Sequence, residues 1–346
     1  MTKKLLSCLI ATIFLSSCNK KTSEVNPPTD GGLITYDAQI PDYEKLTLNT
    51  YEVSDKARIN ESTASANVKK LLEVSGAGMD FVANPDAKTS DMMWFKNVKD
   101  PSAILNINLK NGDISMNRGT MQYMGNKATP DLLKEDEAVK MAKTYLTKMG
   151  VDMGDEKSMY LGHVGGVNMG SHDEMEGNKI YEKFTTVRFD RKLDNIPILG
   201  HSRIIVQMAE KGKLQGLIQQ WAPMNPTAVK PEAVLAKDQV KKSIEEHLLR
   251  ENEGVKKITI RKINLVYYDD GKGVIEPALH VICDLFYPAS AKDSTLKSFK
   301  YDTVEPLLKN PRIIYTFMAE KHDDHPKPQD GVDNNEPLIR GQDEKR

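Results

Sequence analysis

Residues 183–221 read KFTTVRFDRKLDNIPILGHSRIIVQMAEKGKLQGLIQQW. Apolar and polar residues alternate in three parts of this stretch, which predicts strands over 183–189, 202–208 and 214–221. Asp194-Asn195 separates the first two strands, and the polar residues 210–213 separate the last two. Because both gaps suit tight turns, the three strands are predicted to form an antiparallel meander.

The same order of elements is predicted twice along the chain. A helix over 132–149 precedes the meander, and a second helix over 231–250 precedes strands at 258–268, 275–286 and 312–319. Runs of strands that follow each helix favour an α+β fold over a parallel α/β fold. A further hairpin is predicted around Asn111-Gly112, whose residue types suit a type I′ turn.

Two regions are less regular in sequence. Residues 33–100 contain a predicted strand at 46–53 and a predicted helix near 64–74. Residues 150–177 are rich in glycine and are predicted to form loops or an irregular strand.

Several of these stretches resemble a known family. Residues 187–200, VRFDRKLDNIPILG, are similar to a phrase in the propeptides of thermolysin-like peptidases and in envelope proteins with PepSY domains. Glu232-Ala233 and the helix that they open resemble the start of a PepSY domain, and Asp269-Asp270-Gly271 and Glu276-Pro277-Ala278 look like the parts that follow. The resemblance spans residues 100–319 and implies two cystatin-like helix-on-antiparallel-sheet units in tandem. Such units inhibit or chaperone a peptidase, or restrain a sensor, and do not usually catalyse.

The N-terminus is predicted to be a signal peptide. Lys3 and Lys4 precede residues 5–17, which carry no charge and are too few to span a bilayer. The stretch ends in Leu15-Ser16-Ser17-Cys18, which resembles the lipobox of bacterial lipoproteins, where the cysteine is acylated and becomes the mature N-terminus. The alternative is an ordinary signal peptide with an incidental cysteine. In the lipoprotein family, Asn19 favours the outer membrane. Residues 20–24 lack the dense acidic tract that would suggest export to the cell surface, so we expect a lipid-anchored protein that faces the periplasm.

Composition narrows the class of partner. The formal net charge is −1, and it becomes −3 once Lys3 and Lys4 are removed. A nucleic-acid binder would show a basic surface, so no nucleic-acid partner is expected. After cleavage and lipidation only Cys283 remains as a thiol, in a strand-like apolar run that predicts a buried structural residue.

The expected organisation has five segments. They are a signal peptide (1–17), a lipidated tether (18–32), an N-terminal α+β unit (33–226), a C-terminal PepSY-like unit (227–319) and a disordered tail (320–346).

No stretch predicts a catalytic or metal site. Gly200-His201-Ser202-Arg203 resembles part of a nucleophile elbow but lacks the final glycine. Glu245-Glu246-His247 lacks the second histidine of a zinc-peptidase helix and is predicted on a solvated face. The stretch 322–325, with two histidines and two aspartates, is interpreted as polar linker.

The functional hypothesis is therefore a non-enzymatic lipoprotein. It would bind and regulate a peptidase, sensor or other envelope protein, use no cofactor or metal, and have Cys18 as its one assigned site residue. The alternative is an envelope hydrolase or small-ligand carrier with an unrecognised site, suggested by His163 and His172 in the glycine-rich region.

Overall fold

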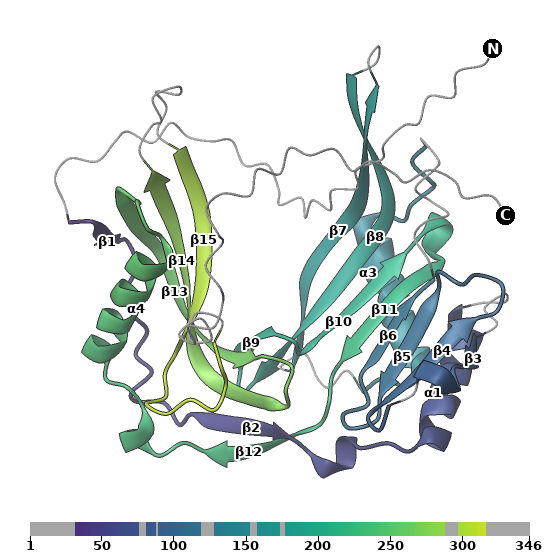
Figure 1. The fold of residues 1–346 in the computed structure, drawn as a ribbon, viewed down its shortest axis with the longest axis horizontal. Coiled ribbons are helices and arrows are strands. Elements are labelled where there is room, and N and C mark those ends of the chain that lie inside the picture. The colour runs from purple at the N-terminus through teal and green to yellow at the C-terminus, as the bar shows by residue number, and fades with distance from the viewer. Residues whose placement is uncertain are drawn as a thin grey trace, which may run out of the picture.

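The computed structural model describes residues 32–75, 81–87, 89–118, 128–152, 158–173, 177–287 and 297–315. These residues form three α-helices and one mixed sheet of fifteen strands (Figure 1). The helices are α1 (Glu61–Ser75), α3 (Glu135–Met149) and α4 (Lys237–Glu251). The strands are β1 (Ile34–Tyr36), β2 (Asn49–Val53), β3 (Phe81–Ala83), β4 (Met92–Asn97), β5 (Ile104–Asn108), β6 (Ile114–Asn117), β7 (Met159–Asp173), β8 (Gly177–Leu193), β9 (Ile196–Gly200), β10 (Arg203–Met208), β11 (Leu214–Gln220), β12 (Met224–Ala228), β13 (Lys257–Asp269), β14 (Val274–Tyr287) and β15 (Lys297–Pro306).

One half of the sheet contains the predicted meander. β10 pairs antiparallel with both β8 and β11, and β11 continues through β6, β5 and β4 to β3. On β10, Ile204, Val206 and Met208 are fully buried, whereas the residues between them are only partly buried. This alternation confirms the pattern that the sequence predicts for a strand with one core face.

Two helices cover the buried face of this half. Apolar residues of α1 and α3 pack with the strands in one core. Ala138, Ala142 and Leu146 of α3 are completely buried, and Gly150 ends the helix in the left-handed conformation. The predicted helices near 64–74 and over 132–149 are confirmed.

The other half is built on the β13–β14 hairpin and β15. Helix α4 packs on one face through Val240, Ile244 and Leu248. On the opposite face, Ile313 and Tyr315 of the C-terminal segment pack with β13 and β14. Glu276 holds this segment, because its buried carboxylate accepts hydrogen bonds from the backbone N–H of Arg312 at 3.0 and 3.1 Å.

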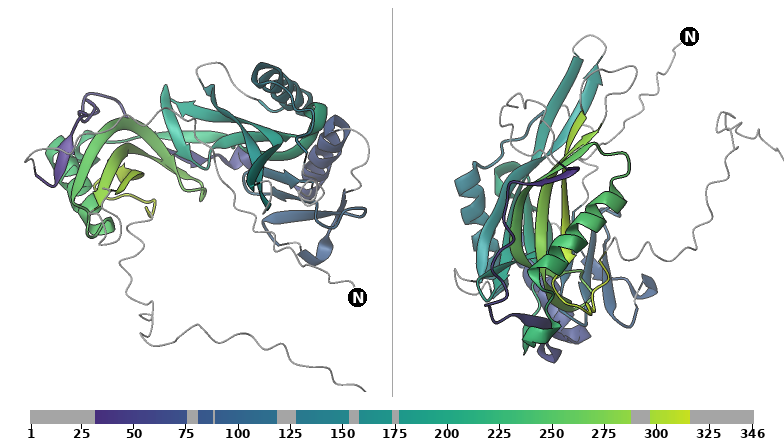
Figure 2. Two further views of the ribbon diagram at one scale, coloured as in Figure 1. Left: turned by 90° about the horizontal axis from the view of Figure 1, so that it is seen from above. Right: turned by 90° about the vertical axis from the view of Figure 1, so that its left-hand side faces the viewer.

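The two halves join through strands that are distant in sequence. β9 pairs antiparallel with β8 and parallel with β13. β1 pairs parallel with β13, while β2 pairs with β14 and β12. At this junction the hydroxyl groups of Tyr51 and Tyr267 donate to Asp194, which lies in the β8–β9 turn with a positive φ. Helix α4 lies at one end of the molecule and α1 near the other (Figures 1 and 2).

The prediction of two cystatin-like helix-on-antiparallel-sheet units in tandem is wrong. Strands account for 46% of the described residues and helices for 23%, and the strands form one large mixed sheet. The parallel contacts of β1 and β9 with β13 join segments far apart in sequence. Local alternation of polar and apolar residues does not encode such pairings, so the sequence pattern could not reveal them.

One element prediction also differs from the structure. The strand expected over 312–319 is absent from Arg312–Tyr315, and a strand lies instead at Lys297–Pro306. Of the glycine-rich residues 150–177, expected as loops or an irregular strand, 159–173 form the long strand β7, whose register against β8 shifts twice, as expected of an irregular strand. The β7–β8 hairpin projects beyond the neighbouring strands (Figure 1).

Candidate functional site

The predicted lipidation residue, Cys18, lies outside the described residues, as does the stretch 322–325. Cys283 is fully buried on β14, and its thiol contacts the backbone oxygen of Tyr301 at 3.5 Å. Burial raises the pKa of this thiol to about 12, so it is not a thiolate nucleophile at neutral pH. The prediction of a buried structural cysteine is confirmed.

His201 and Ser202 lie at the junction between the two halves of the sheet. Ser202 Oγ donates to Asp269 Oδ2 at 2.6 Å, whereas His201 Nε2 lies 2.9 Å from Asp113 Oδ2. A serine nucleophile needs a base within hydrogen-bond reach of its hydroxyl. Each side chain here is bound instead to its own aspartate, so the pair is not arranged as a nucleophile and its base.

This polar cluster connects two hairpin turns. Asp113 follows the β5–β6 turn, and Asp269 begins the β13–β14 turn, where its Oδ1 accepts from Gly271 N at 2.8 Å. The cavity that His201, Ser202 and both aspartates line is about 20 Å³, room for about one water molecule. The hydrogen bond to Asp113 raises the pKa of His201. The cluster is therefore suited to fastening the two halves rather than to binding a substrate.

The histidines of the glycine-rich region lie on one strand. His163 is exposed on β7, and it lines neither the cavity around His201 nor the groove between Tyr43 and Leu235. Its imidazole lies over Gly165, where an added Cβ would be 2.3 Å from Nε2. The backbone of His172 pairs with Asn178 near the end of the hairpin. The two histidines are therefore nine residues apart on one edge strand.

His247 does not lie on a solvated helix face as predicted. Its side chain is 3% exposed and contacts Glu305 of β15, whose carboxylate also accepts from Ser243 Oγ at 3.2 Å. The helical periodicity of α4 places His247 one turn from Ile244 and beside Leu248, on the apolar stripe. That periodicity could have indicated a buried histidine, but the partner 58 residues away could not be read from the sequence.

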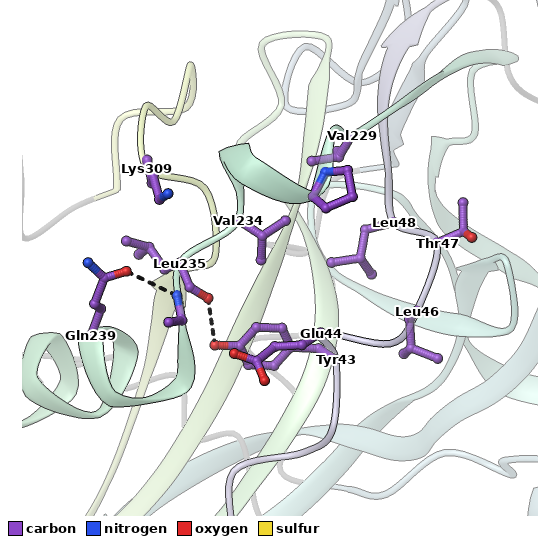
Figure 3. Close-up of a pocket in the computed structure, with 12 residues that line it drawn as sticks. Tyr43, Glu44, Leu46, Thr47, Leu48, Val229, Val234, Leu235, Gln239 and Lys309 are labelled. Atoms are coloured by element: carbon purple, nitrogen blue, oxygen red, sulfur yellow. Dashed lines mark hydrogen bonds between the residues drawn. The ribbon is translucent and has the colours of Figure 1, made fainter.

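A groove lies where the chain leads into α4 (Figure 3). Its volume is about 440 Å³, and its apolar wall consists of Leu46, Leu48, Val229, Pro231, Val234 and Leu235. Polar atoms at its rim have partners within the chain. Tyr43 Oη donates to Leu235 O at 2.9 Å, Glu44 Oε1 accepts from Lys237 N at 3.2 Å, and Lys309 Nζ donates to Glu232 O at 2.7 Å. The groove can receive an apolar side chain, since Leu46 is half exposed, but it presents no catalytic group.

The β15 strand forms an edge of the sheet. Among the described residues it pairs only with β14, over ten consecutive residues without a register shift. Phe299 on this strand is 52% exposed. The sequence prediction omitted β15 because the stretch is polar overall. The alternation of Phe299 and Tyr301 with Lys300 and Asp302 was a signal that could have found it.

The described residues contain no group of three or more side chains that could hold a metal ion. None of the described helices is both long and apolar enough to cross a membrane.

Comparisons with known proteins assign no family. No protein-family model matches the chain, and no curated protein matches it. A crystal structure of an uncharacterised protein from Eubacterium rectale ATCC 33656 is similar over 82% of this chain and 91% of that chain, with 11% sequence identity and a TM-score of 0.46.

Proposed function

We propose that this protein is a non-enzymatic binding protein of the cell envelope, anchored by lipid on Cys18, that engages another envelope protein along the free edge of β15. The observation that carries the proposal is a ten-residue strand with regular pairing on one side only among the described residues. An exposed edge of this kind accepts an additional strand through main-chain hydrogen bonds.

The direction of the free backbone groups follows from one hydrogen bond. Leu307 N donates to Pro277 O on β14 at 3.2 Å. Because backbone groups alternate in direction along a strand, the N–H and C=O of Ser298, Lys300, Asp302 and Val304 point away from β14. Pro306 stands at the next such position, where the absence of an N–H does not disturb the pairing with β14.

The polar groups that resemble catalytic residues support a binding role. Ser202, His201 and His247 are each bound to a carboxylate that belongs to the framework of the sheet. The resemblance to PepSY-containing envelope proteins, whose domains restrain peptidases or sensors, favours a peptidase or sensor as the partner. Asn19, directly after Cys18, favours the outer membrane, and the absence of a dense acidic tract in residues 20–24 favours its periplasmic face.

Affinity capture from crosslinked envelopes tests the proposal. Full-length wild-type chain is compared with Lys300→Pro, which removes one outward N–H, and with Lys300→Thr, which keeps it. We expect one defined envelope protein to be captured by the wild type and by Lys300→Thr and to be lost with Lys300→Pro. Equal recovery with all three chains would place the binding surface elsewhere, and recovery of nothing above background would argue against a binding function.

The anchor is tested separately by Cys18→Ser. We expect the wild type to be recovered with membranes and to incorporate labelled palmitate, and the variant to do neither. Membrane recovery and labelling of Cys18→Ser equal to those of the wild type would contradict lipidation at this residue.

A further inference from the structure

The free edge of β15 has a charge pattern that fits a second copy of itself. Lys300 and Asp302 both have outward backbone groups, and both side chains lie on the same face of the sheet because they are two residues apart. Asp302 is 73% exposed although its Oδ2 lies 3.1 Å from His280 Nε2, and Lys300 is also exposed. A strand that pairs with this edge therefore places its own side chains opposite one positive and one negative side chain of β15.

Antiparallel pairing of two β15 strands has few registers that keep the hydrogen bonds. Residues whose backbone groups point outward must face each other, so in any one register the residue numbers of facing pairs add up to the same even number. Neighbouring registers differ by two in that sum, which shifts the partner of each residue by two positions. With the two-fold axis at Tyr301, Lys300 faces the partner's Asp302 and Asp302 faces the partner's Lys300. One step in one direction places Lys300 opposite the partner's Lys300, and one step in the other places Asp302 opposite the partner's Asp302. Only the register centred on Tyr301 opposes unlike charges at both positions.

The remaining pairs in this register are compatible with a sheet. Ser298 faces the partner's Val304 on the face that carries the charges. Tyr301 faces the partner's Tyr301 on the other face, where Phe299 faces the partner's Thr303. Phe299 already contacts Tyr287 of its own sheet with ring centroids 5.9 Å apart, so the exposed ring is held close to the edge. Aromatic and β-branched pairs across strands stabilise antiparallel sheets.

We infer that two copies of the chain associate through antiparallel β15 strands related by a two-fold axis at Tyr301, forming one sheet across the dimer. The inference rests on the proposed function in one respect, that the β15 edge is the binding surface. A dimer of this kind would cover the edge until the envelope partner displaces one copy. Anchoring in one membrane would raise the effective concentration of the two strands.

The charge pairs make the inference testable with full-length chains that carry two different tags and are expressed together in host membranes. Lys300→Asp places aspartates opposite each other across the axis, and Asp302→Lys places lysines opposite each other. We expect wild-type copies to capture each other after solubilisation, and each variant to capture its own copies at least about tenfold less. A chain with Lys300→Asp mixed with a chain with Asp302→Lys restores both unlike pairs, and this mixture is expected to recover the capture seen with the wild type.

The outcomes separate the two proposals. Absence of wild-type self-capture, or failure of the mixed pair to exceed both single variants, would overturn the dimer. If self-capture is absent while Lys300→Pro still abolishes capture of an envelope protein, the proposed function stands and the second copy is the wrong occupant. Both substituted side chains are exposed, and the contact of Asp302 with His280 at 3.1 Å is a surface pair that adds little stability. The unfolding midpoints of the variants should therefore stay close to that of the wild type, which shows that any loss of capture is not a loss of fold.

Discussion

The two long free edges of the sheet, β7 and β15, are built differently. β7 pairs only with β8 among the described residues, and its register shifts twice, at Leu161/His163 and at Val167/Asn168. β7 also carries four glycines, whereas β15 has neither a glycine nor a register shift. Bulges twist an edge and interrupt its row of backbone groups, which hinders pairing with another chain. The regular pairing of β15 therefore makes it better suited than β7 to accept an additional strand, although both strands are long.

The largest expected effect on stability comes from removing the buried carboxylate that joins β15 to α4. Glu305 is completely buried and contacts His247 of α4, so Glu305→Ala leaves a buried imidazole without this carboxylate. We expect a loss of about 3–5 kcal/mol in the free energy of unfolding, measured by urea denaturation. Asp302→Ala on the same strand removes a 73% exposed carboxylate that lies 3.1 Å from His280 Nε2, and should change that free energy by less than about 1 kcal/mol. Similar losses for the two variants would contradict this account of how β15 is held.

A smaller effect is expected from filling the space above a β7 glycine. A Cβ on Gly162 would lie 1.9 Å from Asp190 Oδ2, while a Cβ on Gly170 would meet nothing within 4 Å. Gly162→Ala must displace the carboxylate that pairs with Arg188 at 3.0 Å and should lower the free energy of unfolding by about 1–3 kcal/mol. Gly170→Ala is the matched control, and a loss as large as that of Gly162→Ala would show that crowding is not the cause.

The smallest expected effect on stability concerns His201. This residue lies at the junction between the half of the sheet that carries β7 and the half that carries β15. The hydrogen bond to Asp113 raises the pKa of His201 above its ordinary value, so its contribution to stability is complete below the pKa of the unfolded chain and is lost as the pH rises through the folded pKa. His201 is one-third exposed, which limits the contribution to less than about 1 kcal/mol.

Urea denaturation from pH 5.5 to 8.5 tests this prediction. The stability difference between the wild type and His201→Gln should be larger at the acidic end and should shrink as the pH rises. The nearby charged groups Asp269 and Arg203 are present in both chains. A difference that grows with pH would mean that the imidazole is stabilised in its neutral form.

Local patterns predicted much of the fold. The alternation in 183–221 located β8, β10 and β11, and helical spacing located α3 and α4. Asn111-Gly112 located the β5–β6 hairpin, but the predicted type I′ turn is wrong, because Gly112 has a φ of 74° whereas the φ of Asn111 is not positive. These elements could be predicted because each one's period and turn residues lie within a short window.

The pairings between distant segments could not be predicted. β1 and β9 have only three residues each in contact with β13, too few to carry a period. The same limit applies to the candidate sites. His201 meets Asp113 across 88 residues, and His247 meets Glu305 across 58, so their structural roles emerge only from the fold. The position of Cys18 depends on a local motif and stays a prediction.

Site-specific photocrosslinking in living cells tests the central claim most directly. A photoreactive residue is placed in the full-length chain at position 299 on β15 or at position 161 on β7, where Phe299 and Leu161 are 52% and 48% exposed. We predict a discrete protein adduct from position 299, lost when Lys300→Pro is added, and none from position 161. Adducts of equal strength from both positions, or an adduct at 299 that survives Lys300→Pro, would contradict recognition through the β15 edge.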